Sequence, residues 1–444
     1  MNRSVDQHRN ASLNTTALDV HTKECYAWAL LFVFVISIAF LYSIIQPLGH
    51  APDEYAHVQY IKFIEAHRRL PVWQPDGGGE AGYESQHPPL YYILNAVLYH
   101  FCISLPENWR WQIMRWFSIL LGGMLFFAVR GFALDLFKKR IVPALVLTSA
   151  FMLMPLTLEY SSHINVDILS VTLSAVVLWM SLRVARGEGK QKDRIVLGIA
   201  LGVGFLTKLT VLGLLPMVIT AYILDSNIDC ECKWVQRRMR FMSTLLITGI
   251  LCGWWYARNS WMYGTPFIHT VGQLSSGINL AAITGEGARL LFITLRNTYI
   301  SSWIEMAWMP PGALGVALYS MLTVMLFIAA GMAIRNRFTL VSFTGAFDPA
   351  LWLCGILLLT LFLSHQTQVW FTDYEFNAGG RYLLNGMVAA HALVISALYK
   401  TRRHRIYWFI WIALFVIMNA FAIHHILTVL TPKCFPDWHP FHFP

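Results

Sequence analysis

The chain has 444 residues, of which 56% are hydrophobic and only 13% are charged, so it is too apolar for an ordinary water-soluble globular protein. Its formal net charge of +9 would suit nucleic acid, but the basic residues gather in alternate loops between apolar stretches, as in the cytoplasmic loops of membrane proteins. We therefore expect no nucleic-acid partner, and the seven cysteines, an odd number, indicate no disulfide framework.

Apolar stretches of about the length needed to cross a bilayer recur along the chain. They predict an all-α polytopic membrane protein with about eleven transmembrane helices in a single domain over residues 1–430, followed by a short outer tail at 431–444. The first stretch is too long for a cleaved signal peptide, so we expect it to remain as a span. The predicted spans cover residues 26–48, 112–135, 142–158, 166–186, 195–207, 209–224, 241–257, 312–333, 350–364, 382–399 and 407–430.

Two predicted outer loops, at residues 49–111 and 258–311, are longer than a purely structural helix bundle needs. In the first loop, the segment from Pro52 to Pro71 predicts a short interfacial helix that begins after Asp53. The segment that starts at His87 is apolar but too short to be a span, so it predicts a second interfacial or re-entrant helix. We thus expect juxtamembrane helices in the first outer loop.

Two adjacent carboxylates, Asp53 and Glu54, stand where the first span emerges on the outer side. Aspartate is a favoured N-cap, and acidic residues in a first turn are stabilised by the helix dipole by about 0.3–1 kcal/mol. Composition alone therefore favours helix capping over chemistry for this pair.

The order of several segments along the chain reverses that preference. They resemble the C-type superfamily of membrane glycosyltransferases, which includes protein O-mannosyltransferases and aminoarabinose transferases acting on lipid A. The resemblance extends over most of the chain, from about residue 48 to about residue 385. The segments are PLGHAPDEYAHVQYIKFIEAHRRLPV from Pro47, ESQHPPLYYILNAVLY from Glu84, NVDILSVTLSAVVL from Asn165, GVGFLTKLT from Gly202, GWWYARNSWMYGTPF from Gly253 and GRYLL from Gly380.

This resemblance implies a reaction and a site. In the superfamily an acceptor hydroxyl displaces a polyprenyl phosphate or diphosphate from the sugar with inversion, and an acid of the first loop is the base. The matching residue is Asp53, with Glu54 the less favoured candidate. A departing phosphate needs cations beside it, and the family-like segments supply Arg258, Arg381 and Lys208. Packing on aromatic rings or contact with lipid head groups is the alternative role for these cations.

Other residues of the same segments are expected around the site. His57, Tyr91 and Tyr92 would shape the acceptor cleft, and two roles stay open for Asp167, which either caps the fourth span or joins the site as a second acid. The outer histidines and acids leave a divalent metal open as an alternative. However, no HExxH-like spacing occurs, so we assign no metal ligand and no certain cofactor.

We therefore expect an inverting glycosyltransferase that moves a sugar from a polyprenyl-phosphate donor to a protein, glycan or lipid acceptor. Its partners would be that donor, that acceptor and membrane lipids, on the non-cytoplasmic face of a bacterial inner membrane. One alternative is a transporter or flippase of lipid-linked glycans, whose expected internal repeats are not found in the sequence. Another is a diphosphate-dependent glycan polymerase or ligase.

Overall fold

The structure is a computed structural model, and it describes residues 2–74, 79–226, 232–268, 285–304, 313–335, 349–371, 379–399 and 401–434. Across these residues the chain is helical, and the sole β pairing is an isolated bridge between Glu80 and Gly82. The predicted all-α class is confirmed for this part of the chain. Residues 435–444, most of the predicted outer tail, lie outside the described residues.

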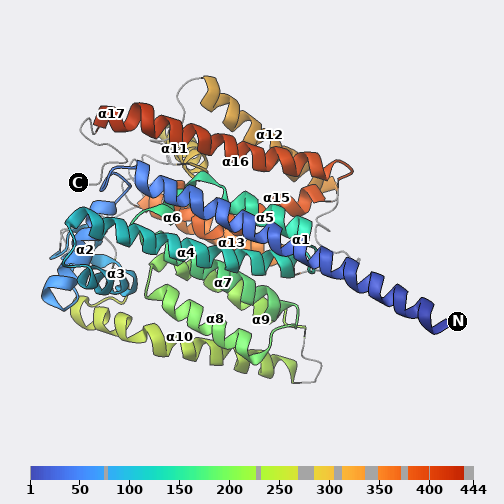
Figure 1. Ribbon diagram of the computed structural model, residues 1–444. Helices are drawn as coiled ribbons and strands as arrows, with labels where there is room; N and C mark the ends of the chain where they lie inside the picture. Colours follow the sequence, from blue (N-terminus) through green and yellow to red (C-terminus); the bar gives the residue numbers. More distant parts are fainter. Residues whose placement is uncertain are drawn as a thin grey trace.

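Most of the helices run side by side (Figure 1). Two shorter helices, α2 and α3, gather at one end of this bundle, and they lie at the two positions in the first predicted outer loop where short helices are expected. The helices of the described part are α1 (Asn2–Ile45), α2 (Glu54–His67), η1 (Tyr83–Gln86), α3 (Leu90–Phe101), α4 (Glu107–Leu136), α5 (Ile141–Met152), α6 (Pro155–Ser162), α7 (Asp167–Ala185), α8 (Gln191–Phe205), η2 (Leu209–Leu214), α9 (Leu215–Ile223), α10 (Lys233–Tyr263), α11 (Gly285–Ser301), α12 (Ala313–Arg335), α13 (Ala350–Phe371), η5 (Gly380–Leu383), α15 (Leu384–Tyr399), α16 (His404–His425), η6 (Ile426–Leu430) and α17 (Thr431–Cys434).

Six helical stretches of the described part are long and apolar enough to cross a membrane, which supports a multi-pass membrane protein. The predicted span at 142–158 corresponds to the bent pair α5 and α6, whose axes differ by 63° and which pass the same length and hydropathy test together. Pro155 stands in the first turn of α6, where a proline is tolerated because its N–H would have no partner within the helix. The same proline cannot continue α5, because a helix interior needs that N–H and has no room for the ring. Because α8, α9, α10 and α13 are shorter or less apolar, the count of eleven spans remains a prediction.

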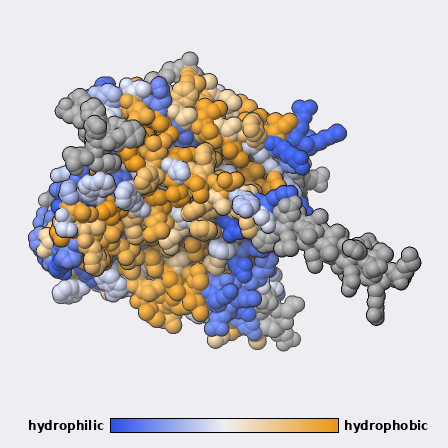
Figure 2. All heavy atoms as spheres, in the orientation of Figure 1, coloured by the Kyte–Doolittle hydropathy of each residue, from blue (hydrophilic) through white to orange (hydrophobic). Residues whose placement is uncertain are grey.

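The surface has an apolar band between two hydrophilic ends (Figure 2). We call the end formed by α2 and α3 the site end. We call the opposite end, where α4 and α7 finish at the basic segments 138–140 and 183–186, the basic end. There Arg183 forms an ion pair with Asp135, and Arg140 donates a hydrogen bond to Tyr399. These two basic segments thus lie at the same end of the bundle, as the alternation of charge predicts.

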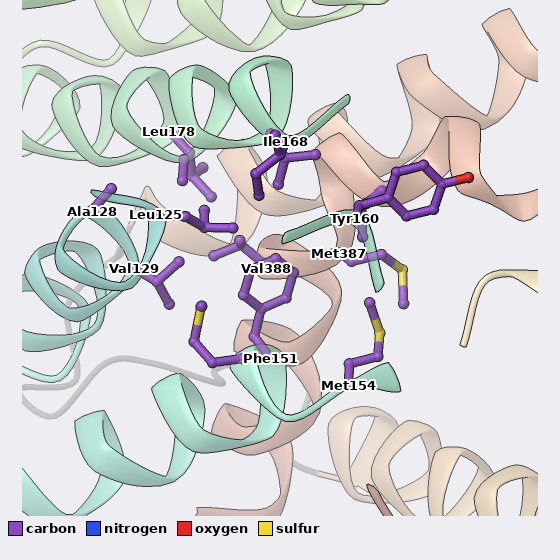
Figure 3. Packing of buried hydrophobic residues seen from close by; sticks show 14 of the residues in the cluster. Leu125, Ala128, Val129, Phe151, Met154, Tyr160, Ile168, Leu178, Met387 and Val388 are labelled. Atoms are coloured by element: carbon purple, nitrogen blue, oxygen red, sulfur yellow. The ribbon is translucent and has the colours of Figure 1, made fainter. Parts of the chain in front are cut away.

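The core lies between α4, the bent pair α5–α6, α7 and α15. Figure 3 shows side chains from these helices meeting: Leu125, Ala128 and Val129 of α4, Phe151 of α5, Met154, Tyr160 of α6, Ile168 and Leu178 of α7, and Met387 and Val388 of α15. All of them are buried. This packing holds the first residues of α7 and of α15 beside the start of α2, which positions the site described next.

Candidate functional site

The candidate site is a cavity of about 640 Å³ at the site end, between the first loop, the start of α7, η2 and η5. One part of its wall is ionisable and includes Asp53, His57, Glu84, His87, Asp167, Lys208 and Arg381. Another part is apolar and includes Leu209, Leu212, Pro216 and Ile268. The cavity can therefore accept a ligand that carries charge at one end and hydrocarbon at the other.

Asp53 precedes α2 and points into this cavity. Its backbone is left-handed, with a φ of 61°, and its side chain makes no capping hydrogen bond to the helix. Instead, one carboxylate oxygen accepts a hydrogen bond from Tyr83 Oη at 2.7 Å, and the other lies 2.7 Å from Arg381 Nη1. Capping by the side chain, which composition favours, is thus not how this residue is used in the structure.

The pKa of Asp53 results from opposing effects. Burial raises it, but Arg381 and the hydrogen bond from Tyr83 lower it by more, so the net pKa is lowered. Asp53 is therefore an ionised carboxylate near neutral pH, and its negative charge is held by a single guanidinium that also lines the cavity.

Glu54, the next residue, points away from the cavity and is completely buried. Arg115 of α4 binds both of its carboxylate oxygens, at 2.8 and 2.7 Å. Burial opposes ionisation, but Arg115 outweighs burial, and the pKa of Glu54 is lowered to about 2. The remaining donors of Arg115 bond the carbonyl oxygens of Ser43, Gln46 and Pro47. Glu54 thus fits a structural ion pair and does not fit the less favoured role as base.

Lys208 and Asp167 form a second buried ion pair in the cavity wall. Asp167 is the first residue of α7, and Lys208 is an extended residue just before η2. Lys208 Nζ also lies 5.4 Å from the ring centroid of Tyr382, and the guanidinium of Arg381 lies 5.3 Å from the same ring. The structure therefore brings two of the three predicted cations to one aromatic residue of the cavity wall.

The third predicted cation, Arg258, is not part of the cavity wall. Its guanidinium lies 5.0 Å from the ring of Trp255 and 5.9 Å from that of Tyr263, and it donates a hydrogen bond to the carbonyl oxygen of Pro71. These contacts are the alternative packing role expected for the predicted cations, and they tie the first loop to α10.

A hydrogen-bonded network extends from the cavity wall to Tyr92 behind it. Glu84 of η1 accepts a hydrogen bond from Tyr92 Oη, lies 2.8 Å from His87 Nε2, and lies 3.8 Å from His57 Nδ1. Burial raises the pKa of Glu84, but His87 and His57 lower it by more. Of the predicted acceptor residues, His57 lines the cavity, Tyr92 lies behind it in this network, and Tyr91 is in the core beside Ser118.

Among the described residues, no group of three or more histidine, cysteine, aspartate or glutamate side chains is arranged to hold a metal ion. The carboxylates of the cavity instead face cations or imidazoles, as the Asp53–Arg381 and Asp167–Lys208 pairs show. The part of the chain that the structure describes therefore provides no ligand set to assign.

Comparison with known proteins gives a family match over part of the chain and a similar fold. Residues 86–256 match a family described as dolichyl-phosphate-mannose-protein mannosyltransferase. The fold is similar to that of ArnT from Cupriavidus metallidurans bound to undecaprenyl phosphate, at 18% identity and a TM-score of 0.51, over 94% of this chain and 67% of that one. It is also similar to the Archaeoglobus fulgidus oligosaccharyltransferase in complex with Zn and sulfate, at 13% identity and a TM-score of 0.53, over 88% of this chain and 53% of that one. No curated protein sequence matches significantly.

Proposed function

We propose that this chain transfers a sugar from a polyprenyl-phosphate donor to a hydroxyl acceptor. Its fold is that of the C-type glycosyltransferases, in agreement with the resemblance in its sequence. The observation that carries the proposal is the carboxylate of Asp53, which stands in a cavity beside Arg381 and Lys208. The chain spans about two thirds of the length of ArnT and about half of that of the oligosaccharyltransferase. The donor and the acceptor proposed for it therefore rest on the residues of its own cavity.

The two parts of the cavity wall match the two parts of such a donor. Arg381 and Lys208 provide positive charge for the phosphate, and Tyr382 keeps both cations on the same side of the cavity. The apolar residues of η2 and the start of α9, among them Leu212 and Pro216, provide a surface for the first isoprene units. The sugar would lie between the phosphate and Asp53.

In the proposed step, the acceptor oxygen attacks the anomeric carbon from the face opposite the phosphate. The new C–O bond forms as the bond between the anomeric carbon and the phosphate oxygen breaks, and the electron pair leaves with the polyprenyl phosphate. Asp53 takes the proton of the attacking hydroxyl, an effect usually worth about 10²–10⁴ in rate. Arg381 and Lys208 stabilise the leaving phosphate, so no strong acid is required.

In this scheme Arg381 can pair with either of two anions, the carboxylate of Asp53 or the phosphate of the donor. Donor binding therefore changes the basicity of Asp53. Without donor, its guanidinium lies 2.7 Å from Asp53. A bound phosphate competes for the same guanidinium. As Arg381 turns toward the phosphate, Asp53 loses its main stabilising charge while it stays partly buried, so it becomes a stronger base.

The test is transfer by purified protein supplied with a polyprenyl-phosphate sugar and candidate acceptors. Asp53→Asn should fold normally and lose about a hundredfold or more of the transfer rate. The matched control is Glu107→Gln, which removes a surface carboxylate that pairs with Lys62 and should leave the rate unchanged. Full transfer by the Asp53→Asn variant would remove the mechanism, and donor that crosses the bilayer without being consumed would indicate a flippase.

The released lipid identifies the donor class. Polyprenyl monophosphate as the product supports the monophosphate-linked donor proposed above. Polyprenyl diphosphate would assign the chain instead to the polymerase or ligase type, and it would require more positive charge than Arg381 and Lys208 provide in the described cavity wall.

A further inference from the structure

A second cavity lies at the basic end, on the outer surface of α4 and α7, and has no part in the proposed reaction. It is a groove of about 440 Å³ lined by Met124, Phe127, Ala128, Arg130, Gly131, Leu134, Lys139, Val176 and Trp179. Met124 and Phe127 are more than half exposed, so the groove opens at the apolar surface of α4, a helix long and apolar enough to cross a membrane.

The contact between α4 and α7 beside this groove requires a glycine in α4. A Cβ on Gly131 would lie 2.5 Å from the indole ring of Trp179, so the ring occupies the space over Gly131. Trp179 is fixed there by a hydrogen bond from its indole N–H to Asp135. The groove is therefore a built feature of the contact between α4 and α7.

Arg130 is the only ionisable residue of this groove that has no anionic partner within the described residues. It belongs to a helix long and apolar enough to cross a membrane, and its guanidinium lies 5.0 Å from the centroid of the Trp28 ring. Its Nε is buried and has no hydrogen-bond acceptor in the described part of the chain. A charged residue at this depth is costly unless an anion or water compensates it.

The surroundings of the groove are basic as well. Lys139 lines it and is paired with Asp135, but Asp135 also holds Arg183, so the carboxylate is shared between two cations. Lys138 follows the same helix and is exposed. The local excess of positive charge is complementary to an anion, and the apolar residues beside it are complementary to hydrocarbon.

We propose that this groove binds one anionic phospholipid of the leaflet that faces the basic end. The phosphate would lie between Arg130 and Lys139, and an acyl chain would follow Met124, Phe127 and Val176 along the groove. The lipid would occupy the junction of α4 and α7. It would therefore stabilise the two helices that carry Arg115 and Asp167 at the other end of the bundle.

The experiment measures lipid retained by the purified, delipidated full-length protein. Phosphatidylglycerol or phosphatidylcholine is added in detergent, and bound lipid is counted by native mass spectrometry while the melting temperature is followed. We expect one tightly bound phosphatidylglycerol and a rise in melting temperature, neither of which phosphatidylcholine reproduces. Arg130→Gln should bind phosphatidylglycerol about tenfold more weakly, because one charge-assisted contact is lost.

Two variants keep the result interpretable. Arg130→Lys retains the charge and should retain most of the binding, and Lys138→Gln removes a neighbouring cation outside the groove and should bind like the unaltered protein. Equal binding of the two lipids, or equal binding by Arg130→Gln and the unaltered protein, would overturn the proposal. So would competition by inorganic phosphate as effective as by the lipid, or a dimer formed through this face. None of these readouts depends on glycosyl transfer.

Discussion

At the scale of single residues, the ion pair between Asp53 and Arg381 controls the pH range in which the proposed base is available. A base acts in its ionised form, so kcat/KM should rise with pH through the pKa of Asp53 and then level off. Arg381 lowers that pKa while burial raises it. Arg381→Gln removes the main charge that lowers this pKa and leaves the hydrogen bond from Tyr83, so the acid limb of the kcat/KM profile should move to higher pH, besides the loss in rate.

The control for this profile is Arg69→Gln. Arg69 belongs to the same loop region but binds Glu80 at the surface, so its removal should leave the acid limb in place. An acid limb that stays where it is in Arg381→Gln would mean that the limiting base is not the carboxylate next to Arg381.

Glu54, the carboxylate next to Asp53 in the sequence, should affect the stability of the fold. The pKa of Glu54 is lowered to about 2, so its contribution is fully present above the unfolded value of about 4.3 and is lost as the pH falls toward 2. Glu54→Gln leaves Arg115 buried without its counterion and should cost about 3–5 kcal/mol in an unfolding titration at neutral pH. Glu65→Gln, which breaks a partly exposed pair with Arg68, should cost at most about 1 kcal/mol. Equal losses would contradict a structural role for Glu54.

At the scale of elements, the short helix η5 places Arg381 by packing tightly on α11. A Cβ on Gly380 would lie 2.3 Å from the carbonyl oxygen of Thr298 and 2.3 Å from Ser302 Oγ, and the backbone N–H of Gly380 donates to Ser301 Oγ. Gly380→Ala must therefore shift η5 and with it Arg381. We expect a rise in donor KM and a rate loss of about tenfold or more, with the chain still folded.

Gly355→Ala is the matched control for η5, because a Cβ at Gly355 in α13 would meet nothing within 4 Å. It should leave donor KM unchanged and, as a glycine replaced within a helix, slightly stabilise the protein. A normal donor KM in Gly380→Ala would show that the position of η5 does not set phosphate binding.

At the scale of the whole molecule, local patterns predicted the helical class and the two short helices of the first loop, and the family resemblance indicated the candidate base. They also indicated Lys208 and Asp167 separately, but only the fold pairs them. Arg115 was missed although its signal was present, as a charge just inside an apolar run.

The features of the site that the sequence did not predict depend on contacts between segments distant along the chain. Tyr83, Glu84 and His87 reach the cavity because residues 79–87 fold back over α2, and no local pattern encodes that return. Arg258 matches a family-like segment, yet it packs on Trp255, since the rotation of α10 about its axis depends on tertiary packing. Motifs therefore identified side chains of the right chemistry, and their assembly required the coordinates.

Sidedness is a property of the whole bundle, and natural cysteines can test it. Cys102 follows α3 at the site end, and Cys232 is exposed just before α10, whose first turns are basic. If the basic end faces the cytoplasm, a membrane-impermeant maleimide added to intact cells should label a variant that retains Cys102 alone. A variant that retains Cys232 alone should be labelled only after permeabilisation. Labelling of both from the same side would contradict opposite ends, and the reverse pattern would place the cavity of Asp53 in the cytoplasm, away from the proposed face of reaction.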